Sequence, residues 1–173
     1  MRVSKADPYI ALAGALDETQ TALGFAATKA AKHPLTAEIN ECLVWMQRNL
    51  FIAGAIILGS ANNDSKTAWS WDTQLNEVEH FCSVFAPHSE LKSFVLPGGS
   101  ELAARIELAR VTIRRLERDY CQLLEDNGEA DTNQDKDIPK HPSAIPFLNR
   151  LSSLAFVLAR RSNELLEVPE QNL

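Results

Sequence analysis

Residues 102–123 read LAARIELARVTIRRLERDYCQL, a stretch in which apolar residues return at alternating steps of four and three. This spacing places them along one side of a helix, because an α-helix turns once every ~3.6 residues. Such a stripe leaves water by packing on neighbouring helices. The stretch therefore predicts a long helix in an all-α fold. Its stripe consists of Leu102, Ile106, Ala109, Ile113, Leu116, Tyr120 and Leu123.

Four further segments repeat this spacing, and no alternating strand pattern competes with them. The first uses Leu12, Leu16, Thr19, Leu23, Ala26 and Ala30, and the second uses Ile39, Leu43, Met46, Leu50, Ala53 and Ile57. Val44, Phe51 and Ile52 widen the second stripe until it is apolar almost all round, which predicts that this helix is central. A third, shorter helix uses Trp71, Leu75, Val78, Cys82 and Phe85; the last follows Pro146 with Leu148, Leu151, Ala155, Leu158 and Leu165.

The breaks between these segments complete the outline of the fold. Pro97, Gly98 and Gly99 interrupt the chain before the longest helix, and Gly99 or Ser100 is available as its N-cap. The segment 125–142 holds six acidic residues, which predicts a mobile acidic loop. We therefore predict one domain over residues 1–173, folded as a five-helix bundle.

Composition limits the classes of partner. The formal net charge is -6 and the pI about 5.2, which argues against binding to nucleic acid or to an anionic membrane surface. The longest apolar run, LFIAGAIILG at residues 50–59, is too short to cross a bilayer. Cys42, Cys82 and Cys121 are widely separated and odd in number, with no zinc or dithiol spacing. We expect a soluble, cytoplasmic protein without a protein-held metal.

The stretch ARVTIRRLER at residues 109–118 carries four arginines in ten residues. Glu107, Arg110, Arg114 and Glu117 follow one another at steps of three, four and three, so they share one flank of the helix. Two interpretations are open from spacing alone. The flank is either a salt-bridged solvent face or an anion site, in which guanidinium groups bind phosphate oxygens two at a time.

Four stretches together resemble the PduO-type ATP:cob(I)alamin adenosyltransferases, a family of corrinoid adenosyltransferases. FVLPGGSELAARIELARVTIRRLER at residues 94–118 is similar to the most specific signature of the family, FxLPGGSxxAAxLHxARTxxRRAER. The other three are RVSKADPYIALAGALDETQTALGFA (2–26), MQRNLFIAGAIIL (46–58) and PFLNRLSSLAFVLAR (146–160). They occur in the family's order and span nearly the whole chain.

The resemblance implies a homotrimeric five-helix bundle that binds ATP and corrinoid between subunits. It implies transfer of the 5′-deoxyadenosyl group from ATP, with Mg2+, to cob(I)alamin, giving adenosylcobalamin and triphosphate. Matched position by position, the catalytic residues are Asp17, Arg110 and Arg114, with Arg110 paired to Asp17 across the subunit interface. The ATP-binding residues are Lys5, Arg114, Glu117 and Asn149. A reductase and a cobalamin-dependent acceptor enzyme are the further partners expected.

Phe94 matches the aromatic residue that, in the family, packs under the corrin ring and keeps the lower axial ligand off cobalt. Cobalt(II) then becomes four-coordinate, and its reduction potential rises because a donor ligand is removed. Without the motif, Phe94 would be interpreted as a core aromatic. By the same bland interpretation Asn149 is a helix N-cap and Asp17 an exposed acid, while the histidines, cysteines and tryptophans have no functional role.

Some positions depart from the family pattern. Tyr9, Gln20, Glu107 and Ser153 stand where the family has arginine, asparagine, histidine and aspartate. The family also has an upstream segment whose amides wrap the triphosphate, and the sequence starts at the last two residues of that pattern, Arg2 and Val3. We therefore expect weak ATP binding by the chain as written. Two hypotheses stay open: an active transferase, or a non-catalytic trimeric relative that binds corrinoid or is purely structural.

Overall fold

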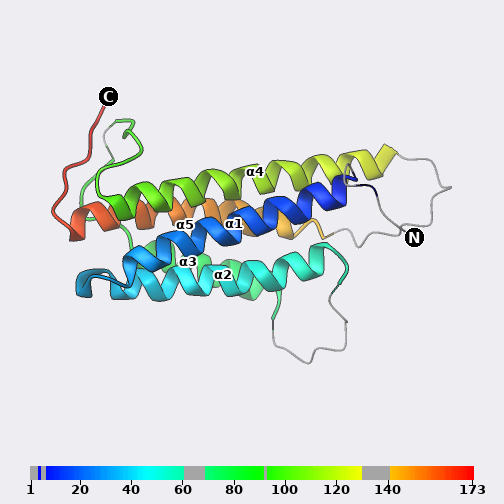
Figure 1. The fold of residues 1–173 in the computed structure, drawn as a ribbon, viewed down its shortest axis with the longest axis horizontal. Coiled ribbons are helices and arrows are strands. Elements are labelled where there is room, and N and C mark those ends of the chain that lie inside the picture. The colour runs from blue at the N-terminus through cyan, green and yellow to red at the C-terminus, as the bar shows by residue number, and fades with distance from the viewer. Residues whose placement is uncertain (1–3, 5–6, 61–68, 92, 130–140) are drawn as a thin grey trace.

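The computed structural model describes residues 4, 7–60, 69–91, 93–129 and 141–173, and it folds as an elongated helical bundle (Figure 1). Its α-helices are α1 (Pro8–Ala30), α2 (Ala37–Ile57), α3 (Trp71–Val84), α4 (Glu101–Glu129) and α5 (Ala144–Leu165). A short 3-10 helix, η1 (Pro34–Thr36), lies between α1 and α2. The predicted all-α, five-helix architecture is confirmed.

The helices pack against one another through their apolar stripes. α4 packs against both α1 and α5, α2 packs mainly on α1, and α3 packs on α5. Every predicted stripe residue of α1, α2 and α4 is buried, as are Leu148, Leu151, Ala155 and Leu158 of α5. Trp69 and Trp71 pack edge-to-face against each other and against Phe147 of α5. Burial of these stripes is the main source of stability.

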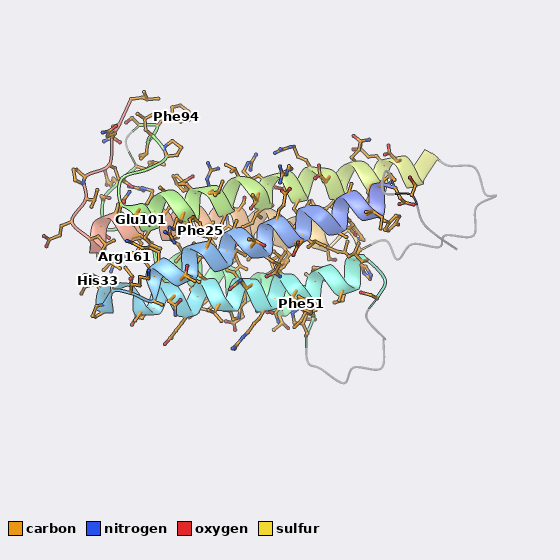
Figure 2. The ribbon with its side chains drawn as sticks, in the orientation of Figure 1. Phe25, His33, Phe51, Phe94, Glu101 and Arg161 are labelled. Atoms are coloured by element: carbon orange, nitrogen blue, oxygen red, sulfur yellow. The ribbon has the colours of Figure 1, made fainter. Side chains whose placement is uncertain are left out.

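α2 is not the central helix, and that prediction is wrong. Phe51 on its outer side is 72% exposed, and Ile52 beside it is also exposed. Phe51 lies on the outer edge of the bundle (Figure 2). α5 instead packs against α4, α3 and α2, whereas α2 contacts chiefly α1.

Two helix boundaries differ from the prediction. α4 continues through residues 125–129, so this part of the predicted acidic loop is helical, while residues 130–140 lie outside the described residues. α5 begins at Ala144, two residues before Pro146. Proline is tolerated there because the N–H groups of a first helical turn have no partner within the helix.

The turn before α4 places a loop at the end of the bundle. Ser100 caps α4, as predicted, since its Oγ accepts a hydrogen bond from the backbone N–H of Ala103 at 3.1 Å. Preceding residues run beside residues 171–173, and Val95 forms an isolated antiparallel bridge with Asn172. Both segments lie at the same end of the molecule (Figure 1). Among the described residues, no helix is long and apolar enough to cross a membrane.

Candidate functional site

The predicted row on α4 is present, and its members differ in environment. Glu107 is 8% exposed, and its Oε2 accepts a hydrogen bond from Arg110 Nε at 2.6 Å. Arg114, one turn further on, is exposed and has no ion-pair partner among the described residues. Arg110 is therefore paired within the row, whereas the Arg114 guanidinium remains available to an anion.

Asn149 and Glu117 are brought together from different helices. The Asn149 side-chain amide on α5 donates to Glu117 Oε1 on α4 at 2.9 Å. Asn149 lies inside α5, so the N-cap interpretation is excluded. These two predicted ATP-binding residues are thus neighbours, and Arg114 lies three residues before Glu117 on the same helix.

Within one chain Arg110 is bound to a neighbour on its own helix, whereas Asp17 is exposed. α1 and α4 run antiparallel, since Lys29 pairs with Glu101 at one end while Glu18 pairs with Arg115 further along. Asp17 is exposed on α1 beside the second of these pairs, and Arg110 is bound to Glu107. Arg110 nevertheless keeps its terminal nitrogens for a second partner, because only Nε is used in this contact.

Phe94 is not a core aromatic, because it is 84% exposed. Its ring projects from the loop at the end of the bundle (Figure 2). Arg114 lies 13 residues beyond the start of α4 at Glu101, which is ~20 Å at 1.5 Å per residue. Within one chain, Phe94 is therefore far from Arg114 and Asn149. Lys5 lies outside the described residues.

The departures from the family pattern have distinct structural roles. Gln20 of α1 and Gln47 of α2 exchange side-chain hydrogen bonds with each other's backbone carbonyls, at 2.9 and 3.0 Å, so Gln20 joins two helices. Ser153 donates to the Asn149 carbonyl at 3.4 Å. Tyr9 lies in the first turn of α1, where its N–H donates to the Asp7 cap. Glu107 is the departure that changes the electrostatics of the site, because it places a carboxylate against Arg110.

Sequence reasoning did not find the side chains that hold the Phe94 loop. Asn163 of α5 accepts from the N–H of Ser100 at 2.8 Å and donates to the Gly98 carbonyl at 3.0 Å. Arg160, one turn earlier, binds both carboxylate oxygens of Glu170. No periodicity could have revealed these contacts, because each joins residues from different segments. The only sequence feature that pointed to Arg160 is its place as the last residue of the family-like stretch 146–160.

Metal and thiol chemistry find no support in the described residues. They contain no group of three or more His, Cys, Asp or Glu side chains arranged to hold a metal ion. Burial raises the pKa of the Cys42 thiol to about 12, and it also raises the pKa of Cys82 and of Cys121. These thiols therefore stay protonated at neutral pH.

Comparison with known proteins extends this picture. Residues 1–162 match the protein family described as Cobalamin adenosyltransferase. A protein of Mycobacterium tuberculosis (strain ATCC 25618 / H37Rv) named Corrinoid adenosyltransferase is 34% identical over 170 residues, covering 94% of this chain and 79% of the relative. One of the same name from Bacillus subtilis (strain 168) is 29% identical over 151 residues, covering 87% and 72%.

Solved structures are similar over the whole fold. A variant PduO-type ATP:corrinoid adenosyltransferase from Lactobacillus reuteri, complexed with cobalamin and ATP, has a TM-score of 0.78 and 26% sequence identity. The similarity covers 99% of this chain and 86% of that chain. A second variant of the same enzyme, complexed with ATP, has the same TM-score and identity.

Proposed function

The chain belongs to the cobalamin adenosyltransferase family, and from this we propose that it transfers the 5′-deoxyadenosyl group of ATP to cob(I)alamin. Cob(I)alamin is the second substrate, and its cobalt supplies an electron pair to C5′ of ATP. A cobalt–carbon bond forms, the C5′–O bond breaks, and its electron pair leaves with triphosphate. Cobalt passes from the +1 to the +3 state, and the products are adenosylcobalamin and triphosphate.

The observation that carries this proposal is the exposed Arg114 guanidinium beside the Asn149–Glu117 pair. Negative charge grows on the triphosphate as the C5′–O bond breaks, so a fixed cation at that point stabilises the transition state more than the bound substrate. Arg114 can supply this cation because it has no in-chain carboxylate to neutralise it among the described residues. Glu117, held by Asn149, and Lys5 complete the nucleotide site in this assignment.

Magnesium fits this site as an ion carried by the nucleotide. Mg2+ is usually bound through substrate phosphates and one or two carboxylates, and the described residues offer no preformed cluster of three. Glu117 is the carboxylate of this row that lies nearest to Arg114 in sequence, and it would contribute at most one ligand. When bound, the ion neutralises phosphate charge and orients the triphosphate chain.

Phe94 is assigned to the corrinoid. An aromatic ring that is 84% exposed on a single chain has apolar area available for a flat, apolar partner such as a corrin ring. Packing there would exclude the lower axial ligand from cobalt and favour the four-coordinate cobalt(II) form. Arg110 and Arg114 contribute through charge, whereas Phe94 contributes through the space it fills.

We assign the sites to subunit interfaces of a homotrimer. The outer face of α1 and α4 carries exposed Phe25, Leu108 and Val111, and this apolar area gains by burial against another copy. The Arg105 guanidinium lies 3.8 Å from the centre of the Phe25 ring. Phe25 is labelled in Figure 2. A second subunit would also bring its own Phe94 loop toward the nucleotide residues. In this arrangement Asp17 pairs with Arg110 of a neighbouring subunit.

Two further partners belong to this proposal. A reductase would supply cob(I)alamin, and an acceptor enzyme would take up adenosylcobalamin.

The reaction itself is the test. Chemically reduced cob(I)alamin and Mg-ATP are mixed with the protein under anaerobic conditions, and adenosylcobalamin is followed by its visible spectrum while triphosphate is separated by ion exchange. The expected result is stoichiometric formation of both products. Arg114→Ala is expected to lower kcat by roughly 100-fold or more, as for loss of one group that stabilises developing charge.

Arg118→Ala provides the matched control, because Arg118 is an exposed arginine one turn further along α4. It is expected to retain nearly full kcat. Corrinoid binding without either product would instead establish the non-catalytic relative. Equal activity of Arg114→Ala and Arg118→Ala would show that the row is a solvated face.

A further inference from the structure

The loop that carries Phe94 is fastened on both sides by one helix. Upstream of Phe94, Arg160 Nη2 on α5 donates to the Ser89 carbonyl at 3.2 Å and to Ser89 Oγ at 3.1 Å. Downstream, Asn163 binds Gly98 and Ser100. Arg160 and Asn163 are three residues apart and so lie on one side of α5. The two flanks of the loop therefore have fixed positions relative to the bundle.

The residues after α5 cover the outside of the same loop. The N–H of Leu96 donates to the Gln171 carbonyl at 2.8 Å, and the N–H of Leu173 donates to the Phe94 carbonyl at 3.0 Å. With the Val95–Asn172 bridge, these bonds make a short two-stranded pairing next to Phe94. A pairing this short is marginal in water by itself, so it needs an anchor elsewhere.

That anchor is the ion pair between Arg160 and Glu170. Arg160 Nε and Nη2 each donate to a different oxygen of the Glu170 carboxylate at 2.9 Å, which is the bidentate geometry of a strong pair. The two side chains are only 9% and 16% exposed. Glu170 immediately precedes Gln171, so the carboxylate fixes the start of the paired segment. One guanidinium thus joins α5, Ser89 and the segment that pairs with Phe94–Leu96.

We infer that Arg160 and Glu170 are positioning residues of the corrinoid site, which hold the Phe94 loop in place through the paired segment 171–173. The inference depends on the function proposed above for Phe94. Because the Phe94 ring is 84% exposed, packing within the chain does not orient it, and its backbone contacts must. Loss of the Arg160–Glu170 pair is expected to free the backbone of Phe94 and Leu96 while leaving the five-helix core intact.

The first measurement needs no substrate. Glu170→Gln keeps the size of the side chain and removes its charge, and amide hydrogen exchange is followed at Leu96 and through α4. Exchange at Leu96 is expected to accelerate roughly tenfold or more, because the partly buried ion pair is broken, while exchange in α4 is unchanged. Glu79→Gln is the matched control, since it breaks another ion pair of α5, with Arg150, away from this loop.

The second measurement reads the position of Phe94. Glu170→Gln is expected to weaken cob(II)alamin binding by roughly tenfold and to diminish the four-coordinate cobalt(II) signal in electron paramagnetic resonance, with Mg-ATP affinity within about twofold of wild type. Combined with Phe94→Ala, Glu170→Gln should add nothing further to either loss, because both act through the same ring. Glu79→Gln should leave both readouts unchanged in either background.

Leu173→Pro tests the same idea if Glu170→Gln folds poorly. It removes the backbone N–H that donates to the Phe94 carbonyl and restricts the backbone of Asn172, at a residue whose side chain is 80% exposed. An unchanged cobalt(II) signal in both variants, or a parallel loss of corrinoid and ATP affinity, would overturn the positioning role. Faster exchange at Leu96 in a protein that neither binds corrinoid nor turns over would instead overturn the proposed function, and the positioning role with it.

Discussion

At the scale of single residues, Phe94 combines a large ring with almost complete exposure. Its ring makes little contribution to the stability of one chain, since area that stays in water gains nothing on folding. We therefore predict that Phe94→Ala leaves Tm unchanged and abolishes the four-coordinate cobalt(II) signal. Turnover should persist with chemically pre-reduced cob(I)alamin and fail with cobalt(II) plus a flavin reductant. Equal loss in both assays would mean that Phe94 has a packing role.

Gly99 is the residue on which the turn before α4 depends. Its φ is +91°, and a Cβ placed there would meet the Asn163 side-chain amide at 2.6 Å. Gly99→Ala is expected to destabilise the protein by ~2–4 kcal/mol, from backbone strain and displacement of Asn163, and to weaken corrinoid binding. Chemical denaturation measures the first effect. Gly98→Ala is the control, because Gly98 has φ +141° and open space around its Cβ, so it should show only the strain.

Individual roles were only partly predictable from the sequence. The helical period placed Glu107, Arg110, Arg114 and Glu117 on one flank, and the structure keeps them there. Period could not tell which of them are paired, because Glu107–Arg110 and Arg114–Glu117 have the same spacing. In the structure the first pair forms, while Glu117 is bound by Asn149 from another helix. Contacts between different segments, such as that of Arg160 with Glu170, produce no periodic pattern in the sequence.

At the scale of elements, the stripes predicted all five helices and the core positions of α1, α2 and α4. In α3 they were less accurate, because Trp71, Leu75 and Cys82 are only partly buried. The error at α2 has a physical cause: an all-round apolar helix is buried by something, and sequence cannot say whether that is the same chain. Phe51 and Ile52 are exposed in this chain. The acidic segment was wrongly predicted to be a loop from its first residue, although α4 continues to Glu129. Composition indicates only that a segment is polar, whereas the end of a helix depends on where its backbone hydrogen bonds stop.

The start of α4 should respond to pH through Glu101, which pairs with Lys29 of α1 and is labelled in Figure 2. Hydrogen bonds from Lys29 and then Arg105 lower the pKa of Glu101 below its ordinary value of 4.5. A lowered pKa in the folded state means that the stabilisation is present above pH 4.5 and is lost as pH falls through the folded value. Glu101→Gln should therefore lower Tm slightly at pH ~7, and the difference from wild type should shrink as pH falls below 4.5 and the wild-type carboxyl takes up a proton.

Thermal unfolding at several pH values checks this expectation. Glu41→Gln is a suitable control, because Glu41 is an exposed helical acid for which the described residues provide no ion-pair partner. A difference in Tm between wild type and Glu101→Gln that does not shrink at all as the solution is acidified would show that the pairs with Lys29 and Arg105 are not the cause.

At the scale of the whole molecule, the proposed trimer makes a prediction about charge. Asp17→Arg or Arg110→Asp alone should weaken assembly and activity, because a partly buried charge would be left unpaired, at a cost of several kcal/mol. The double variant should recover part of the loss. Sedimentation velocity measures assembly. Glu107→Gln is informative beside them, since it frees Arg110 from its in-chain partner and should strengthen any pairing with Asp17 of a neighbour.

If sedimentation shows the same species for wild type, both single variants and the double variant, and activity does not change either, then Asp17 and Arg110 do not meet across subunits. The exposed Phe25, Leu108 and Val111 would still require a partner surface, and substitution of Leu108 by a charged residue would locate it.

The antiparallel contact of α1 with α4 also has a kinetic consequence. Its bonds join residues 72 and 80 positions apart, as in Lys29–Glu101 and the Arg105 contact with the Phe25 carbonyl, whereas α4 and α5 follow one another in the chain. Closing a loop that long costs entropy before the contacts repay it, so we expect α1 to dock after α4 and α5 have paired. Lys29→Met should then speed unfolding and leave the refolding rate almost unchanged in stopped-flow experiments. The lifetime of the folded chain, more than its rate of formation, would be set along this helix pair.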